Sequence, residues 1–211
     1  MAQDFSETNL LVGCRDAEER RKLLGDLFSR HRERLRRMVA LHLDRRLLGR
    51  IDASDVLQET FIEAARRLDE YLAKADAPLF VWLYFLAAQS LQAVHRRHLG
   101  AQARDVRREV SINGGMVPQA SSEALAAQLL GQEPSPSEAA IQAERKAALE
   151  DALDGMQEAD REILVLRNFD QLTNSETARV LGISERAART RQLRALERLQ
   201  EILKKIGGGT L

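Results

Sequence analysis

An arginine-rich segment near the C-terminus has the residue types that bind nucleic acid. Residues 185–205 include seven Lys or Arg and three Asp or Glu residues, which gives the segment a net charge of +4. On a helix of about 3.6 residues per turn, Arg186, Thr190 and Arg194 share one face, and Arg189 and Arg191 lie on its flanks. Such a face can reach base edges in the major groove while its flanking arginines reach phosphates. The alternative is a solvated helix face, but a helix-turn-helix pattern precedes the segment and favours DNA contact.

An acidic set of residues forms a second candidate surface. Spacings of i, i+3, i+4 and i+7 place four residues on one helix face beside the apolar Phe61: Asp55, Gln58, Glu59 and Ile62. Taken alone, the pattern favours a solvated face, with Asp55 stabilised by the helix dipole. Asp55 and Glu59 are not predicted to be a catalytic pair, because no histidine or set of metal ligands accompanies them.

Residues 91–110 form a basic stretch with a net charge of +3. Such a stretch can attract the phosphate backbone, although cations at a helix end also complement the dipole. Trp82 and Tyr84, which precede it, could stack on an unpaired base. Their helix is strongly apolar, so burial in the core is the favoured interpretation. The arginines of the stretch are Arg96, Arg97, Arg104, Arg107 and Arg108.

Neither a cofactor site nor a catalytic site is predicted. His95 and His98 have the spacing of half a metal site, but no further ligand clusters with them, and a basic helix end explains them better. The phosphate-binding motifs GxxxxGK[ST] and GxGxxG are missing. Cys14, the single cysteine, cannot form an internal disulfide. The sequence therefore predicts a binding protein with no metal and no cofactor, rather than an enzyme.

The composition narrows the class of protein. Among 211 residues, 32 Lys or Arg balance 32 Asp or Glu, so the formal net charge is zero. The sequence contains no run of about 18 apolar residues, so no transmembrane helix is predicted. Its N-terminus lacks the pattern of a secretory signal. We therefore expect a cytoplasmic protein without membrane insertion. Abundant Ala, Leu, Arg and Glu with few aromatic residues favour an all-α fold.

Helices are expected to position all of these residues. Apolar residues at spacings of three and four predict a long amphipathic helix between residues 16 and 48. A second helix is expected to begin at Asp52, a favourable N-cap, and a third at Pro78, which suits a first helical turn. Residues 111–137 contain no Lys or Arg and include prolines and glycines, which predicts a linker with a short helix over 122–130.

Four further helices are expected, over 138–154, 158–169, 174–181 and from 185 to about 206, with Ser137 and Ser184 as N-caps. Within 173–191, Ala178 is small where two helices must approach, and Gly182 lies where the turn needs a positive φ angle. Leu181 and Ile183 would fill the core between the helices. These features favour a helix-turn-helix motif over an ordinary helical hairpin. The inward face of its second helix would carry Ala188, Gln192, Ala195, Leu196 and Leu199.

Several segments resemble the sigma-70 family of bacterial RNA polymerase sigma factors. Asp160–Arg167 and Thr173–Leu199 resemble region 4, Asp52–Phe61 resembles region 2.2, and Phe80–Ala87 with His95–Arg97 resembles regions 2.3 and 2.4. Because there is no room for a full region 3, the chain resembles the extracytoplasmic-function (ECF) group. Gln192 departs from the pattern, since a core leucine is common in the family at that position.

The resemblance implies a transcription initiation factor that binds core RNA polymerase, reads the −35 promoter element with region 4 and opens the −10 element with region 2. It implies that the clamp helices of the β′ subunit contact Asp55, Gln58, Glu59, Phe61 and Ile62, and that the flap of the β subunit contacts region 4. The residues implied at −35 DNA are Ser184, Arg186, Arg189, Thr190, Arg191 and Arg194. Those implied at −10 DNA are Lys74, Trp82, Arg96, Arg97 and His98, and a loop at about Lys74–Ala77 would form part of a pocket for a flipped base. An anti-sigma factor or another regulator is a further expected partner.

The expected organisation is a tail at 1–15, region 2 at 16–110, an acidic linker at 111–137, region 4 at 138–206 and a tail at 207–211. By resemblance the linker runs through the polymerase cleft, where Glu123, Glu133 and Glu138 could mimic nucleic acid. One alternative is a conventional helix-turn-helix regulator that binds DNA without forming holoenzyme. Another is an adaptor that binds polymerase but not DNA.

Overall fold

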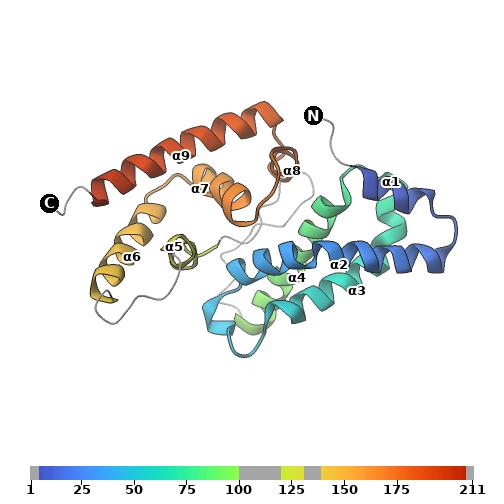
Figure 1. Ribbon diagram of the computed structural model, residues 1–211. Coiled ribbons are helices and arrows are strands. Elements are labelled where there is room, and N and C mark those ends of the chain that lie inside the picture. The colour runs from blue at the N-terminus through green and yellow to red at the C-terminus, as the bar shows by residue number, and fades with distance from the viewer. Residues whose placement is uncertain (1–4, 100–119, 131–138, 208–211) are drawn as a thin grey trace.

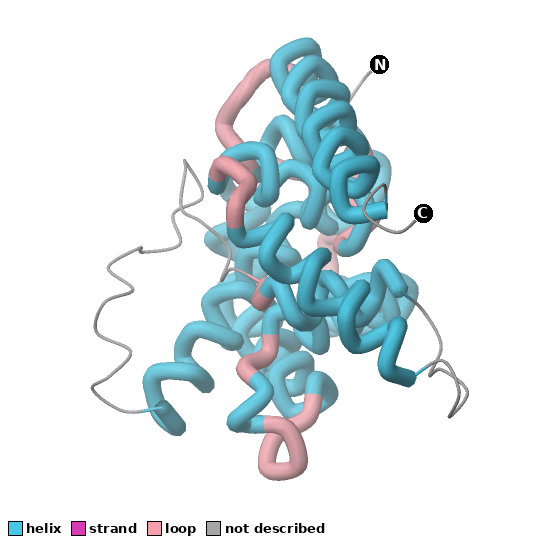
Figure 2. The backbone as a smooth tube through the Cα atoms, turned by 90° about the vertical axis from the view of Figure 1, so that its left-hand side faces the viewer, coloured by secondary structure: helices cyan, strands magenta, loops and turns pink. Residues whose placement is uncertain are grey.

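The protein is built from helices. The computed structural model describes residues 5–99, 120–130 and 139–207. Within these ranges helices are joined by short turns and no residue belongs to a strand, as Figure 2 shows. The predicted all-α fold is therefore confirmed. None of the helices in the described ranges is long and apolar enough to cross a bilayer.

Four helices form an N-terminal bundle, at the right of Figure 1: α1 (Ser6–Gly13), α2 (Ala17–His42), α3 (Ala53–Lys74) and α4 (Leu79–Leu99). Helices α2, α3 and α4 pack against one another, and α1 lies on α2 and α3. Capping residues explain where two of them begin. The Asp16 carboxylate accepts hydrogen bonds from the first backbone N–H groups of α2, and Asp52 forms a capping box with Asp55 at the start of α3.

The bundle differs from the sequence prediction in two places. Helix α1 lies within residues 1–15, where only a tail is expected. Helix α2 ends at His42 instead of near residue 48, because Asp44 caps a short 3-10 helix, Arg45–Leu47, and Gly49 then adopts a φ of 88°. The other expected helix starts are confirmed, since α3 follows Asp52 and α4 follows Pro78.

The described residues of the C-terminal half, 120–130 and 139–207, form five α-helices: α5 (Ser122–Leu130), α6 (Ala139–Asp154), α7 (Glu158–Leu164), α8 (Asn174–Val180) and α9 (Glu185–Gly207). Each helix that the sequence predicts here is present. The helix predicted over 158–169 ends in a π-helical turn, Val165–Phe169, in which the Asp170 N–H donates to the Val165 carbonyl at 2.9 Å. The predicted N-cap at Ser137 lies outside the described residues.

The short helix expected in the linker, α5, packs against α6. Its Glu123 makes ion pairs with Arg45 of the N-terminal bundle and, at 3.2 Å, with Lys146 of α6. The Glu123 carboxylate is therefore engaged within the protein in this conformation. The other two acidic residues proposed for the linker, Glu133 and Glu138, lie outside the described residues.

One apolar core joins the two halves. The largest cluster of buried side chains comes from α1–α4 and the segments between them, and it also includes Leu166, Leu172 and Val180 from the C-terminal half. Leu172 is only 1% exposed. Burial of apolar surface is the main stabilising term in folding, so these side chains hold the halves together. As a result α8 lies against α4, at the junction visible near the centre of Figure 1.

Candidate nucleic-acid interface

Helices α8 and α9 form a helix-turn-helix motif whose turn is fixed by hydrogen bonds. Thr173 and Glu176 make a capping box at the start of α8, with backbone-to-side-chain distances of 3.2 Å and 2.7 Å. Gly182 has a φ of 63°, and the next N–H, that of Ile183, donates to the Ala178 carbonyl at 2.9 Å. The Asn174 amide donates to the backbone of the first turn of α9 at 3.0 Å. The predicted motif is confirmed.

Small residues let α9 approach the helices beneath it. Ala178 is 4% exposed, and Ala188 and Ala195 are fully buried. Gln192 is half-buried, and its side-chain oxygen accepts a hydrogen bond from Arg167 Nε at 3.0 Å. This contact accounts for a polar side chain on the inward face. Leu196 does not belong to that face as predicted, because it is 38% exposed.

The face of α9 that points away from the core carries the residues expected at −35 DNA. Ser184 caps the helix by accepting from the Ala187 N–H at 3.1 Å. The Thr190 hydroxyl donates to the Arg186 carbonyl at 2.9 Å, which leaves its oxygen free to accept. Arg191 is half-buried, and the remaining members of the set are exposed: Ser184, Arg186, Arg189, Thr190 and Arg194. The structure therefore brings this set together on one side of one helix.

The predicted acidic face of α3 is present, but Glu59 and the neighbouring Phe61 make contacts within the protein. Asp55 and Gln58 are exposed, and Ile62 is 61% exposed. Glu59 is engaged in an ion pair with Arg97 of α4 at 2.6 Å. Phe61 is turned inward, with its ring edge-on to Phe28 at a centroid distance of 5.1 Å.

Most residues expected at −10 DNA lie at the two ends of α4. Arg96, Arg97 and His98 are exposed at its C-terminal end, and Lys74 is exposed at the end of α3. Trp82, in contrast, is 6% exposed and stacks on Tyr71 at 4.2 Å. Burial of Trp82, the interpretation that its apolar helix favours, is therefore confirmed. Arg104, Arg107 and Arg108 lie outside the described residues.

The two histidines at the C-terminal end of α4, His95 and His98, lie in different environments. His95 is partly buried, and its Nε2 accepts the Asp44 N–H at 3.2 Å, whereas His98 is exposed. Burial lowers the pKa of His95 from its usual value, which keeps the ring neutral and able to accept this hydrogen bond. Across the part of the chain that the structure describes, no group of three His, Cys, Asp or Glu side chains is placed to hold a metal ion.

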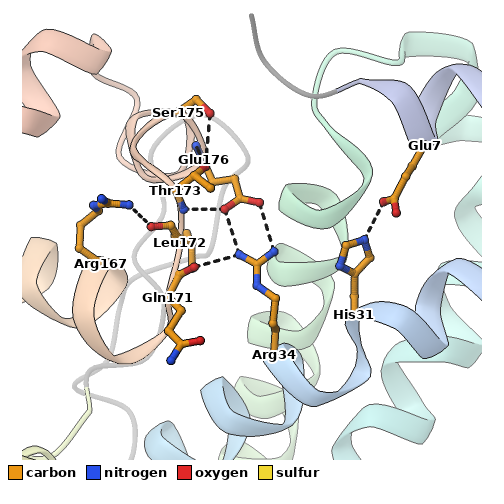
Figure 3. Close-up of polar contacts among 9 residues, drawn as sticks. All are labelled: Glu7, His31, Arg34, Arg167, Gln171, Leu172, Thr173, Ser175 and Glu176. Atoms are coloured by element: carbon orange, nitrogen blue, oxygen red, sulfur yellow. Dashed lines mark hydrogen bonds and ion pairs between the residues drawn. The ribbon is translucent and has the colours of Figure 1, made fainter. Parts of the chain in front are cut away.

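The two halves of the protein meet at a junction of polar contacts that the sequence does not predict (Figure 3). Arg34 of α2 donates to the Glu176 carboxylate at 3.0 Å and 3.4 Å, and to the Gln171 carbonyl at 3.0 Å. The same guanidinium lies 3.6 Å from the centre of the Phe80 ring, a cation–π contact. Because Glu176 also caps α8, Arg34 ties the N-terminal bundle directly to the helix-turn-helix motif.

A buried carboxylate, Asp170, forms the second polar part of the junction. The Tyr84 hydroxyl donates to its Oδ2 at 2.5 Å, and His42 Nε2 lies 3.2 Å from the same oxygen. The Asp170 side chain is fully buried and that of His42 is 2% exposed. Burial and the neighbouring carboxylate raise the pKa of Tyr84 well above its usual value, so the hydroxyl remains a donor. Tyr84 could have indicated this contact in the sequence, because it was expected to be buried and a buried tyrosine hydroxyl normally has a hydrogen-bond partner.

Comparison with known proteins adds a family to this geometry. Residues 146–199 match the family model described as "Sigma-70, region 4". The chain is 28% identical over 193 residues to RNA polymerase sigma factor CarQ of Myxococcus xanthus, covering 90% of this chain and 91% of CarQ. It is 29% identical over 178 residues to ECF RNA polymerase sigma factor BldN of Streptomyces coelicolor, covering 84% of this chain and 61% of BldN.

A solved structure shares the fold. The structure of CnrH in complex with the cytosolic domain of CnrY superimposes with a TM-score of 0.51 at 21% identity. The match covers 96% of this chain and 97% of CnrH. The likeness therefore extends over both halves of the protein, in addition to the helix-turn-helix motif.

Proposed function

We propose that this chain is an extracytoplasmic-function sigma-70 factor, and that its surfaces divide the work of promoter recognition as follows. It is a transcription initiation factor that joins core RNA polymerase and directs it to promoters. We assign the −35 element to α9, and core polymerase and the −10 element to the N-terminal bundle. The observation that carries the assignment is the exposed arginine face of α9 on a well-formed helix-turn-helix.

At the −35 element, α9 enters the major groove with its N-terminal turns against the bases. Arg186 and Arg194 project from the middle of the exposed face and contact base edges, where guanidinium groups pair with guanine in two-point contacts. Arg189 and Arg191 flank them and contact phosphates, which position the helix without reading sequence. Thr190 offers a hydroxyl between the two arginines that face the bases.

Core polymerase binds the exposed side of α3. Asp55, Gln58 and Ile62 supply a small apolar centre with a polar surround, which is the usual composition of a protein interface. Phe61 supports this surface from beneath by packing on Phe28. Glu59 acts indirectly, since its ion pair fixes Arg97 beside the polymerase-binding surface.

The −10 element lies along the exposed ends of α4. Arg96, Arg97 and His98 attract the phosphate backbone, and the α3–α4 loop next to Lys74 forms part of the pocket for an unpaired base. Trp82 contributes through its packing on Tyr71, below the surface. The protein has no catalytic role of its own and acts in the cytoplasm. A second protein would bind and regulate it; CnrH, which shares the fold, is in complex with the cytosolic domain of CnrY.

The two halves separate when both promoter elements are read. The −35 and −10 elements lie about 25 base pairs apart, which is roughly 85 Å of duplex at 3.4 Å per pair. A compact chain of 211 residues has a radius of gyration of only about 17 Å. The arrangement in which Leu172 and Asp170 are buried against the bundle is therefore the closed form of the free protein.

Run-off transcription with purified core polymerase on a promoter library tests this assignment. The Arg186→Ala and Arg194→Ala variants should each lose roughly 1–3 kcal/mol of promoter binding and should relax selectivity at single −35 positions. Arg36→Ala, which removes an exposed arginine of α2, is the matched control and should leave transcription unchanged. Ile62→Ala should weaken core binding, whereas Arg66→Ala on the same helix should not.

If the chain bound promoter DNA tightly but gave no transcript with core polymerase, it would be a conventional helix-turn-helix regulator instead. Retention of full −35 selectivity by both arginine variants would remove the recognition-helix assignment.

A further inference from the structure

A backbone hydrogen bond closes the first part of the loop between α3 and α4. Ala75 ends α3 in the left-handed region, with a φ of 43°, and its N–H donates to the Tyr71 carbonyl at 2.7 Å. Ala77 is buried, and Pro78 begins the turn into α4. Because proline has no N–H, Leu79 carries the first backbone donor of α4, and such donors lack a partner inside their own helix.

That partner comes from α1, a helix that was not predicted from the sequence. The Thr8 hydroxyl oxygen accepts the Leu79 N–H at 3.0 Å and lies 2.8 Å from the Tyr71 hydroxyl. The Tyr71 hydroxyl in turn donates to the Ala77 carbonyl at 2.8 Å. Thr8 is 1% exposed and Tyr71 is 5% exposed, so water does not compete for these groups.

The protons in this set can be assigned without ambiguity. Tyr71 has one hydroxyl proton, which is given to Ala77, so Thr8 must donate its own proton to the Tyr71 oxygen. The hydrogen bonds then run in one direction, from Leu79 through Thr8 and Tyr71 to Ala77, and they join both sides of Pro78. Burial raises the pKa of Tyr71 to about 12, so the tyrosine keeps its proton across the physiological range.

Independent contacts hold α1 and Tyr71 in place. Leu11 of α1 is fully buried in the main core, and Glu7 lies 2.6 Å from His31 of α2. The Tyr71 ring stacks on Trp82 with an angle of 11° between the planes. The hydroxyl of Thr8 is therefore presented to the loop by a helix that is itself anchored to the bundle.

We propose that Thr8 is a positioning residue for promoter recognition: α1, through the Thr8 hydroxyl, fixes the α3–α4 loop in the shape that reads the −10 element. This inference rests on the proposed placement of −10 DNA at that loop. Lys74, at the end of α3, and Asp76, in the loop, are exposed, and Lys74 Nζ lies 3.3 Å from Glu70 on the same helix. Leu79 is held by Thr8 and Ala77 by Tyr71. A loop that is already ordered loses less entropy on binding and rejects wrong bases more strictly.

The test is the selectivity of the holoenzyme for a cognate −10 element over elements with single substitutions. Thr8→Val keeps the shape of the side chain but removes its hydroxyl, so two buried groups lose a partner. We expect selectivity to fall by roughly tenfold, with −35 selectivity unchanged. Thr8→Ser restores the hydroxyl and should restore selectivity. Asn9→Ala, at an exposed neighbouring site on α1, is the matched control and should behave as the unaltered protein.

A second variant and a second measurement keep the inference testable if Thr8→Val folds poorly. Tyr71→Phe removes the hydrogen bonds that Tyr71 makes with Thr8 and with the Ala77 carbonyl but keeps the ring stacked on Trp82, and it should lower −10 selectivity similarly. In Thr8→Val, which removes the acceptor of the Leu79 N–H, hydrogen exchange at the Leu79 amide of the free protein should accelerate by roughly tenfold.

Each remaining outcome would overturn a distinguishable claim. If Lys74→Ala and Asp76→Ala change −10 selectivity while Thr8→Val and Tyr71→Phe do not, the loop reads DNA without help from α1 and the inference is wrong. If the loop variants also leave selectivity unchanged, the placement of −10 DNA at this loop fails, and the role of Thr8 fails with it. Loss of −35 and −10 selectivity together in Thr8→Val would indicate a general structural defect and would also overturn the inference.

Discussion

Removal of the Arg34 guanidinium should open the junction. Arg34 makes charge-assisted hydrogen bonds at 3.0 Å to both Glu176 and the Gln171 carbonyl, and it lies 3.6 Å from the centre of the Phe80 ring. Its side chain is 26% exposed and that of Glu176 is 14% exposed, so solvent screens the pair only in part. Hydrogen bonds to charged groups contribute about 1.5–3 kcal/mol and an exposed cation–π contact about 0.5–1 kcal/mol. Arg34→Ala should therefore destabilise the closed form by about 2–3 kcal/mol.

A double-mutant cycle isolates the ion pair from the rest of this loss. Glu176→Gln is the partner variant, because the amide oxygen can still accept the Thr173 N–H and preserve the cap of α8. Urea unfolding of the four proteins should give a coupling free energy of about 1 kcal/mol between Arg34 and Glu176. The exposed Arg36–Glu33 pair within α2 is the matched control, and its coupling should be about 0.3 kcal/mol.

A distance measurement tests whether the free energy lost in Arg34→Ala comes from opening of the closed form. In a Cys14→Ser background, spin labels introduced at Ser29 of α2 and Leu203 of α9, both exposed, report the separation of the halves. Arg34→Ala should shift the distance distribution toward longer and broader values. A coupling below about 0.3 kcal/mol, together with an unchanged distribution, would refute the reasoning, because the ion pair would then contribute no more than an isolated surface pair.

Three further predictions concern buried or partly buried polar groups. Asp170→Ala leaves Tyr84 and His42 without their shared acceptor and should destabilise the closed form by about 3 kcal/mol, measured by urea unfolding, while Tyr84→Phe should cost about 1 kcal/mol. Hydrogen bonds from Arg46 lower the pKa of Asp44 to about 2, so the carboxylate stabilises the fold above its unfolded pKa near 4, and this contribution is lost as pH falls through 2. Asp44→Asn should therefore cost about 1 kcal/mol at pH 7 after solvent screening, and the difference from the unaltered protein should shrink between pH 4 and 2. Burial lowers the pKa of His95, so an NMR titration should find its ring neutral below pH 6.5, and protonation at lower pH should destabilise the fold as the Asp44 N–H loses its acceptor.

Under the proposed function, the closed junction would limit promoter binding by the free protein. In this arrangement α9 is fixed beside the N-terminal bundle, so the two proposed DNA-binding surfaces cannot lie on distant promoter elements at once. A contact of a few kcal/mol is small enough for core polymerase to overcome through the interfaces proposed for it on α3 and on the C-terminal half. On this proposal, the stability of the junction sets how strongly the closed form competes with holoenzyme formation.

Local signals in the sequence predicted most of the helices and the exposed arginine face of α9, the proposed DNA-binding surface. Asp52 and Ser184 mark helix starts because their side chains bond nearby backbone N–H groups, and Gly182 marks the turn because it adopts positive φ without strain. The exposed face of α9 followed from helical periodicity, since the positions of Arg186, Thr190 and Arg194 depend only on the pitch of one helix. Such features act over a few residues and can be inferred from them.

Tertiary structure alone decided the partners of the remaining polar groups. Phe61 turns inward instead of joining the acidic face, because Phe28 of another helix receives its ring. Arg34 and Glu176 lie 142 residues apart in sequence, and no periodicity links positions on different helices. The sequence predicts that Thr8 lies in a tail, whereas in the structure its hydroxyl oxygen accepts the Leu79 N–H next to the α3–α4 loop. The sequence thus determined most of the helices and their faces, whereas the packing of those helices decided which charged side chains stay exposed and which make contacts within the protein.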